Sequence, residues 1–261
     1  MTNKAEYLPH KKAEIERFFD KASVGRNLML RDPILKYEQD MRQKAIMELL
    51  EPNEGELILD IGCGSARDLK VFADSGAICV GIDFSSGMLS QGREAINKIE
   101  ARNIHLIRAD ANKLPFKAAV FDKVSCSEVI EHLPNWEDAI AEMNRVLKME
   151  VKLVITTPNR HSLYGFTKKL TDLLRFAGIT FHPYDEWKTQ NEVMMILEKY
   201  DMLVDKKIGI CFIPSALTYF LPKRAKKLVV RISSQIEKRL RSRFTGKGYM
   251  IGLRAIRRAK V

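Results

Sequence analysis

The sequence lacks long apolar runs, paired cysteines and, toward its C-terminus, acidic residues. No window holds the roughly 18 uninterrupted apolar residues that a membrane-spanning helix requires. Residues 1–7 lack the apolar core of a secretory signal. We expect neither a metal site nor disulfides, but a reduced, cytoplasmic protein, because no C-x-x-C pair occurs among the four cysteines: Cys63, Cys79, Cys126 and Cys211.

The shortage of acidic residues is confined to the C-terminal segment. From Leu221 onward the sequence has 14 Lys or Arg and a single acid, Glu237, whereas residues 1–220 carry 30 basic and 32 acidic residues. The formal net charge of +11 therefore comes entirely from this segment. Its apolar residues recur at three- and four-residue steps, which predicts an amphipathic helix with one apolar stripe: Ala225, Leu228, Val229, Ile232, Ile236, Leu240 and Phe244.

A basic amphipathic segment such as residues 221–244 has three interpretations. It can bind an anionic membrane surface, where each charge contributes about 1 kcal/mol near acidic lipid. It can instead hold the phosphates of RNA or DNA. In the third interpretation the stripe packs on the protein and the charges only face water. We favour the membrane over nucleic acid, because few aromatic residues alternate with the basic ones.

The most informative motif is an apolar run, residues 57–61, that leads into a glycine turn. The run has the length and composition of a buried parallel strand. Gly62 and Gly64 allow a sharp turn and a close approach to a ligand. Asp60 places a carboxylate at the carboxyl end of the strand, where open α/β sheets bind ligands. The dinucleotide fingerprint G-x-G-x-x-G is incomplete, because its sixth position is Arg67, and an acidic turn suits a positively charged small molecule.

Strand and helix patterns alternate after this turn, which predicts an α/β fold with a mostly parallel sheet. Two helices are expected before the first strand, at residues 11–21 and 33–50. Further helices are expected at residues 67–74, 86–101, 136–147 and 190–200, and an amphipathic segment at 162–176. The expected later strands are residues 78–82, 104–107, 121–126, 151–157, 202–213 and 249–256, the last of them antiparallel.

Four short motifs carry a resemblance to a known family. They are D-x-G-x-G at residues 60–64, S-E-V-I-E-H-L-P at 127–134, T-T-P-N at 156–159 and F-F-D-K-A at 18–22, which is similar to the family's F-D-x-x-A segment. The chain resembles the class I S-adenosylmethionine (SAM)-dependent methyltransferases, and most closely those of ubiquinone and menaquinone biosynthesis. The resemblance implies one Rossmann-like, seven-stranded domain with helices on both faces. Residues 1–50 would form a helical lid, 51–160 the cofactor core, and 161–261 the substrate-side half with its basic insertion.

The resemblance assigns the cofactor to the turns that follow the strands. Asp83, 21 residues beyond Gly62 at the tip of the second strand, is placed to bind both ribose hydroxyls. In the family an Asp at the place of Asp110 accepts a hydrogen bond from the adenine amino group. Arg42 either reaches the cofactor's carboxylate or lies on a solvated helix face. The complete expected set is Arg42, Asp60, Gly62, Cys63, Gly64, Asp83, Phe84, Met88, Asp110, Ala111 and Ser127.

Methyl transfer to a hydroxyl or amine also requires removal of a proton. The candidate bases follow the fourth strand: Glu128, Glu131 and His132. Of these, the resemblance selects His132 and Glu131, a pair that lines the acceptor pocket in some relatives and only holds a loop in others. Other pocket candidates are His161 and the loop residues His182, Tyr184, Asp185 and Trp187. The family's signature for amino methylation, N-P-P-Y, is absent from residues 157–160.

These observations predict a SAM-dependent methyltransferase that acts on oxygen or carbon of a small or lipid-like acceptor at a membrane surface. A quinone precursor or another prenyl lipid would account for both the motif after strand four and the basic segment. Two alternatives stay open: an RNA methyltransferase that uses the basic segment, and a non-catalytic SAM-binding protein that docks on membranes.

Overall fold

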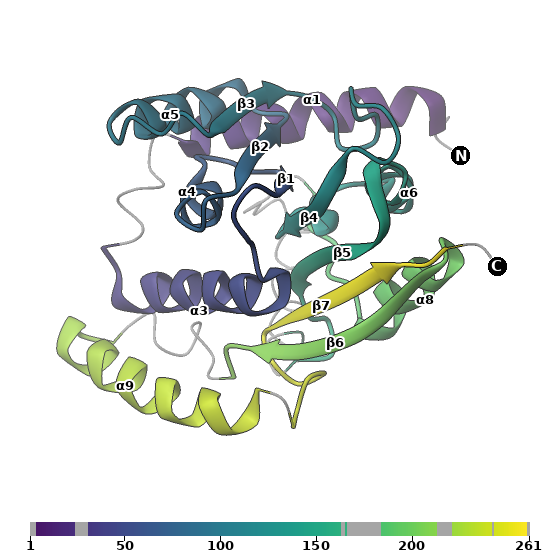
Figure 1. The fold of residues 1–261 in the computed structure, drawn as a ribbon. Helices are drawn as coiled ribbons and strands as arrows, with labels where there is room; N and C mark the ends of the chain where they lie inside the picture. The colour runs from purple at the N-terminus through teal and green to yellow at the C-terminus, as the bar shows by residue number, and fades with distance from the viewer. Residues whose placement is uncertain are drawn as a thin grey trace.

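The computed structural model describes residues 4–23, 31–162, 165, 184–212, 221–241 and 243–259, and these contain one seven-stranded sheet (Figure 1). Its order is β3-β2-β1-β4-β5-β7-β6, and only β7 runs antiparallel to its neighbours. The predicted fold class is therefore confirmed, including the antiparallel last strand. The strands are β1 Leu57–Ile61, β2 Ile78–Asp83, β3 Ile104–Arg108, β4 Phe121–Ser127, β5 Leu147–Pro158, β6 Met202–Ile210 and β7 Met250–Arg257.

Helices cover both faces of the sheet, and a hydrophobic core lies on each side. One core holds apolar side chains of α3, α4 and α5, and the other holds those of α6 and α8. A further helix, α1, lies along α5 at the β3 edge (Figure 1). The helices are α1 Lys4–Ser23, α3 Pro33–Leu50, α4 Arg67–Ala73, α5 Ser86–Asn97, α6 Trp136–Val146, α8 Gln190–Lys199 and α9 Lys223–Leu240.

The strand order explains where a ligand site forms. From β1 the chain builds outward to β2 and β3, and then returns to add β4 on the other side of β1. The loops after β1 and β4 therefore diverge to opposite faces, which leaves a crevice at the carboxyl ends of these strands. The glycine turn after β1 and the motif after β4 both lie at this crevice.

Several element boundaries differ from the sequence expectation, and α1 differs most, since it begins at Lys4 rather than residue 11. β5 begins at Leu147 rather than residue 151, because the chain leaves α6 directly into an extended conformation and Leu147 pairs with Phe121. β6 ends at Ile210, and Cys211 then takes a left-handed conformation with φ +58°. α5 ends at Asn97, four residues early. Of the amphipathic segment expected at 162–176, only Ser162 and Gly165 are described, and His182 lies outside the described residues.

The basic helix α9 lies between β6 and β7 in the chain and packs on α3 (Figure 1). Its buried face centres on two polar residues, Ser233 and Glu237. The backbone N–H of Cys211 donates to Glu237 at 2.8 Å, and the Tyr37 hydroxyl lies 3.5 Å from the same carboxylate. The one acidic residue of the C-terminal segment is thus a buried anchor rather than a surface charge.

The predicted apolar stripe of α9 is divided between two environments. Val229 and Leu240 are half-buried, whereas Leu228 and Ile232 are 59% and 46% exposed. The stripe is therefore only partly covered by the described protein, because the helix docks through Ser233 and Glu237 instead. Among the described helices, none is long and apolar enough to cross a membrane.

Candidate active site

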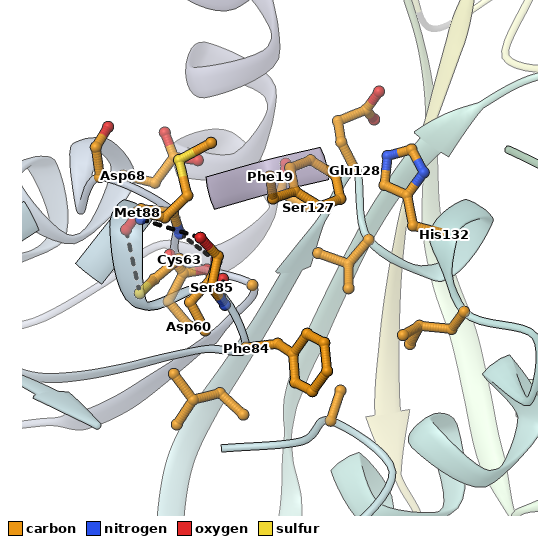
Figure 2. Close-up of a pocket in the computed structure, with 18 of the residues that line it drawn as sticks. Phe19, Asp60, Cys63, Asp68, Phe84, Ser85, Met88, Ser127, Glu128 and His132 are labelled. Carbon is orange, nitrogen blue, oxygen red and sulfur yellow. Dashed lines mark hydrogen bonds between the residues drawn. The ribbon is translucent and has the colours of Figure 1, made fainter. Parts of the chain in front are cut away.

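A pocket opens at the carboxyl ends of β1, β2 and β4 and is covered in part by α1 and α3 (Figure 2). Every residue that the sequence assigned to the cofactor lines it, as does His132. Asp68 and Met88 lie toward one side of the pocket, whereas Glu128 and His132 lie toward the other (Figure 2). We call these sides the cofactor half and the acceptor half.

The glycine turn of the cofactor half requires both of its glycines, for different reasons. Gly62 has φ +69°, and a Cβ there would lie 2.3 Å from the Val129 side chain. Gly64 has φ +52°, but nothing lies within 4 Å of a Cβ built on it. Gly62 therefore permits close packing of two loops, and Gly64 leaves backbone open to the pocket. Ala66 adopts φ +61° with a Cβ, at some cost in strain.

Asp83 joins the turns that follow β1 and β2. One of its carboxylate oxygens accepts from the N–H of Gly64 and the other from the N–H of Ser85, both at 2.8 Å. Two backbone donors fix the orientation of the carboxylate before any ligand is present. The Ser85 hydroxyl in turn accepts from the N–H of Met88 and caps α5.

Asp110 is engaged by the helix that covers the pocket. Its Oδ1 accepts from the N–H of Asn112 at 2.9 Å, and its Oδ2 lies 2.5 Å from Nζ of Lys12 on α1. A ligand amino group at Asp110 would therefore share this carboxylate with Lys12. No local sequence pattern indicates this contact, because the two residues are 98 positions apart.

Arg42 of α3 is buried in an ionic cluster beside the glycine turn. Its guanidinium lies 3.0 Å from Asp68 and donates to the Ser127 hydroxyl. Burial, together with the nearby Asp68, raises the pKa of Asp60 well above its usual range. One guanidinium thus faces two buried carboxyl groups, an environment that favours a positively charged ligand. Arg42 lies in the pocket and not on a solvated helix face.

Glu128 lines the acceptor half immediately after β4. It is half-buried and has a left-handed backbone, φ +55°, which is unusual for a residue with a Cβ. The Thr156 hydroxyl donates to its Oε1 at 3.2 Å. Burial raises the pKa of Glu128 to about 7, although the Arg42 charge acts in the opposite direction.

His132 forms part of the wall beside Glu128. Its Nδ1 lies 3.2 Å from the carbonyl oxygen of Tyr184 and 4.0 Å from the Asp185 carboxylate. Its Nε2 lies 3.9 Å from Glu131, and its ring packs edge-on against Phe19 of α1 at 5.3 Å. The ring is thus held by contacts on three sides.

Glu131 lies behind His132 and does not line the pocket. It is 1% exposed, and its carboxylate accepts from the Thr157 hydroxyl at 3.0 Å. The short helical turn Ile130–His132 directs this side chain inward. Burial, followed by the effect of Glu128, raises the pKa of Glu131 well above its usual range. Any influence of Glu131 on a ligand passes through His132.

The other sequence candidates lie further out. His161 is exposed and outside the pocket lining, and Trp187 donates its ring N–H to Asp185 at 3.1 Å. Two pocket residues that the sequence analysis did not select, Glu38 and Gln39, come from the middle of α3. Their helix carries no motif that could have indicated them.

Helix α1 is fastened to the cofactor half by one carboxylate. Asp20 accepts from the Ser85 hydroxyl at 2.5 Å and from the N–H of Gly87 at 2.9 Å. The Ser85 bond is the largest of the effects that lower the pKa of Asp20. The neighbouring Phe19 lines the pocket. The ring of Phe18 packs edge-on against the ring of Phe19, with 5.4 Å between the ring centroids.

Comparison with protein sequences shows that the chain is similar to known enzymes. A family described as a methyltransferase domain matches residues 59–155. The demethylmenaquinone methyltransferase of Corynebacterium urealyticum is 32% identical over 165 residues, which cover 63% of this chain and 68% of that protein. The enzyme of the same name from Listeria welshimeri is 26% identical over 176 residues, or 66% of this chain and 73% of that protein.

Solved structures show the same fold at lower identity. A SAM-dependent methyltransferase from Thermotoga maritima superposes with a TM-score of 0.70 at 19% identity, covering 94% of this chain and all of that one. The geranyl diphosphate C-methyltransferase of Streptomyces coelicolor, solved with S-adenosyl-L-homocysteine, gives a TM-score of 0.59 at 13% identity, covering 84% and 79% of the two chains.

Proposed function

Because the chain belongs to the class I SAM-dependent methyltransferases, we propose that it methylates an oxygen or carbon atom of a small, lipid-like acceptor at a membrane surface. The enzyme class and the cofactor SAM follow from the family. A quinone precursor is the favoured acceptor, since the similar sequences are named for the methylation of demethylmenaquinone.

The cofactor half fits SAM by the chemistry of its groups. When bound, SAM supplies a methyl group on a positively charged sulfur that is a good leaving group. Asp60, in its cluster with Asp68 and Arg42, would face the cofactor's positive charges, and Gly64 would let its backbone approach. Asp83 would hold the ribose hydroxyls and Asp110 the adenine amino group. Phe84, Met88, Ala111, Cys63 and Ser127 would complete the walls.

Of the pair that the resemblance selects, His132 lines the acceptor half and Glu131 lies behind it, and we propose that the two orient the acceptor. His132 contacts the pocket directly, and Glu131 supports its ring from behind. Phe19, which belongs to α1, packs against the His132 ring and lines the pocket beside it. We propose that α1 and α3 act as a lid that excludes water from the reacting atoms.

The observation that carries the membrane part of the proposal is the outer surface of α9. Two large apolar side chains, Leu228 and Ile232, are exposed there. Exposed basic residues flank them on the same helix: Lys223, Arg224, Lys227, Arg231 and Arg239. Exposed apolar residues beside positive charges fit an anionic lipid surface. The enzyme would then be a peripheral protein on the cytoplasmic face of a membrane.

Vesicle binding by the double variant Leu228→Ser with Ile232→Ser tests this surface. Both residues are exposed and the Glu237 anchor is kept, so the fold should persist. We expect co-sedimentation with phosphatidylglycerol vesicles to weaken by about tenfold or more. The matched control is Leu203→Ser, since Leu203 is 44% exposed on β6, and it should bind as the wild type does.

Two outcomes would oppose the membrane proposal. If the wild-type protein does not bind phosphatidylglycerol vesicles, docking on an anionic membrane is excluded. If the wild type instead binds RNA with a steep salt dependence and no vesicles, the basic helix would belong to an RNA methyltransferase. Vesicle binding without any methyl transfer to quinone-like acceptors would favour the non-catalytic alternative.

A further inference from the structure

We propose that Glu128 is the residue that takes the proton from the methyl acceptor, with His132 as its positioning neighbour. The inference rests on the proposed function and assigns one step of it. It starts from the orientation of the three candidate side chains after β4. Only Glu128 and His132 line the pocket, because Glu131 points into the protein.

The two ring nitrogens of His132 both face protein groups. Nδ1 faces the Tyr184 carbonyl oxygen and the Asp185 carboxylate. Nε2 faces Glu131, which lies outside the pocket lining. Nδ1 is thus held by the Tyr184 carbonyl oxygen, and the ring packs edge-on against Phe19. These contacts suit a residue that shapes the acceptor half beside Glu128.

Glu128 ends a chain of hydrogen bonds that starts at a charged group. Arg42 donates to the Ser127 hydroxyl, which lies 2.8 Å from the Thr156 hydroxyl. Thr156 donates to Oε1 of Glu128 at 3.2 Å. Because Thr156 uses its single hydroxyl proton for Glu128, the Ser127 hydroxyl donates to Thr156, and all donors point toward Glu128. The chain stabilises a negative charge on Glu128 without a direct ion pair that would weaken it as a base.

The surroundings of Glu128 suit a base that works near neutral pH. Burial raises its pKa to about 7, and Arg42 acts in the opposite direction. Asp185 and Glu38 raise it further from the loop before α8 and from α3, and Glu131 is the nearest carboxyl group on its own segment. A general base is most effective when its pKa lies near the working pH.

The left-handed backbone at Glu128 sets the direction of its side chain. A φ of +55° is costly for a residue with a Cβ, and of the eight described non-glycine residues with a positive φ, Glu128 alone lines the pocket. The conformation directs Glu128 into the pocket immediately after Ser127, while the N–H of Glu128 still bonds the carbonyl of Thr156 at 3.0 Å.

The assigned step balances for a hydroxyl acceptor. The acceptor's O–H bond breaks, and its proton passes to a Glu128 oxygen. The electron pair left on the acceptor forms the new bond to the methyl group, whose bond to sulfur breaks with that pair staying on sulfur. Glu128 then returns its proton to solvent when the product leaves the open pocket.

The test uses 2-naphthol, a phenol that stays neutral below about pH 9, as an acceptor probe for the SAM-loaded protein. A hydroxyl bonds an ionised carboxylate more strongly than a neutral one. We therefore expect wild-type affinity for 2-naphthol to rise about tenfold as the pH passes through about 7. Glu128→Gln should bind the probe with no such rise and methylate it at least about 100-fold more slowly.

Three further variants separate a base from a merely structural residue. Thr156→Val removes the last hydrogen bond of the chain, so the midpoint of the pH dependence should move upward. Glu137→Gln, at an exposed carboxylate that pairs with Lys199, should behave as the wild type. His132→Gln should weaken probe binding at every pH but keep its pH dependence.

Two results would overturn the assignment: a pH dependence that survives in Glu128→Gln, or one that disappears in His132→Gln instead. A failure of the proposed function is distinguished by SAM titration in the absence of the probe. If SAM binds and Glu128→Gln transfers methyl groups at the wild-type rate, only the assignment of Glu128 is wrong.

Discussion

The key side chains of the two halves of the pocket are held by different kinds of contact. In the cofactor half, backbone groups within two residues hold the key carboxylates: Asp83 bonds the N–H of Ser85, and Asp110 that of Asn112. In the acceptor half, Glu128 and His132 are held by side chains and loops that are 28 and 52 positions away. The cofactor half thus combines local backbone contacts with long-range ones such as Lys12–Asp110 and Arg42–Asp68, whereas the side chains of Glu128 and His132 are held by long-range contacts.

This difference has a consequence for function. A local turn can keep its geometry while the rest of the chain changes, so it suits a ligand that all relatives share. A site assembled from α1, α3, the turn after β4 and the loop before α8 changes whenever any of these elements shifts. The acceptor half is therefore the part of the enzyme in which substrate choice can vary.

The largest expected effect on stability is at the glycine turn of the cofactor half. In Gly62→Ala the new Cβ would meet Val129 at 2.3 Å and the backbone would keep a positive φ. We expect this variant to lose about 3 kcal/mol of unfolding free energy. Gly64→Ala has the same kind of φ but open space, so it should lose only about 1 kcal/mol. Urea denaturation measures both, and equal losses would contradict the packing explanation.

A smaller and opposite effect is expected in the acceptor half. Because the folded-state pKa of Glu128 is raised to about 7, its ionisation destabilises the fold as the pH rises from about 4.5 to about 7. Glu128→Gln removes that penalty. It should be about 1–2 kcal/mol more stable than the wild type at pH 8 and equally stable at pH 4. Denaturation at the two pH values checks this, and a destabilised variant at pH 8 would show that the carboxylate is structural.

The smallest expected effect concerns the contact between α1 and the cofactor half. Asp20→Asn weakens the bonds from the Ser85 hydroxyl and the Gly87 N–H. We expect a loss of about 1 kcal/mol, seen as faster amide exchange in α1 and a few-fold lower affinity for SAM. Asp40→Asn, at an exposed residue that pairs with Lys36, is the control. Unchanged exchange in Asp20→Asn would mean that α1 is held by other contacts.

The same contrast between local and tertiary structure decides what the sequence could predict. The glycine turn, Asp83 and the cap at Ser85 were predictable, because residues a few positions apart determine their geometry. The contact of Lys12 with Asp110 was not, since a lysine on a helix carries no mark of its partner. Likewise, the buried role of Glu237 was hidden by the basic residues around it.

In the acceptor half, the motif after β4 indicates which residues follow the strand but not where their side chains point. Glu128, Glu131 and His132 were expected as a group, but the directions of their side chains depend on the short helical turn Ile130–His132 and on the left-handed residue Glu128 before it. Neither feature can be predicted from the residues of the motif alone. The early start of β5 was missed for a related reason, since its pairing with Phe121 across the sheet keeps Leu147 extended.

Calorimetric titration of SAM measures whether the cofactor half binds this cofactor through Asp83. We expect wild-type protein to bind SAM and Asp83→Asn to bind it at least about tenfold more weakly. The matched control is Asp122→Asn, which alters a carboxylate that also accepts from a backbone N–H, that of Leu57, at the amino end of β1. The control should bind as the wild type does. A folded wild-type protein that does not bind SAM, or an Asp83→Asn variant with full affinity, would contradict the account.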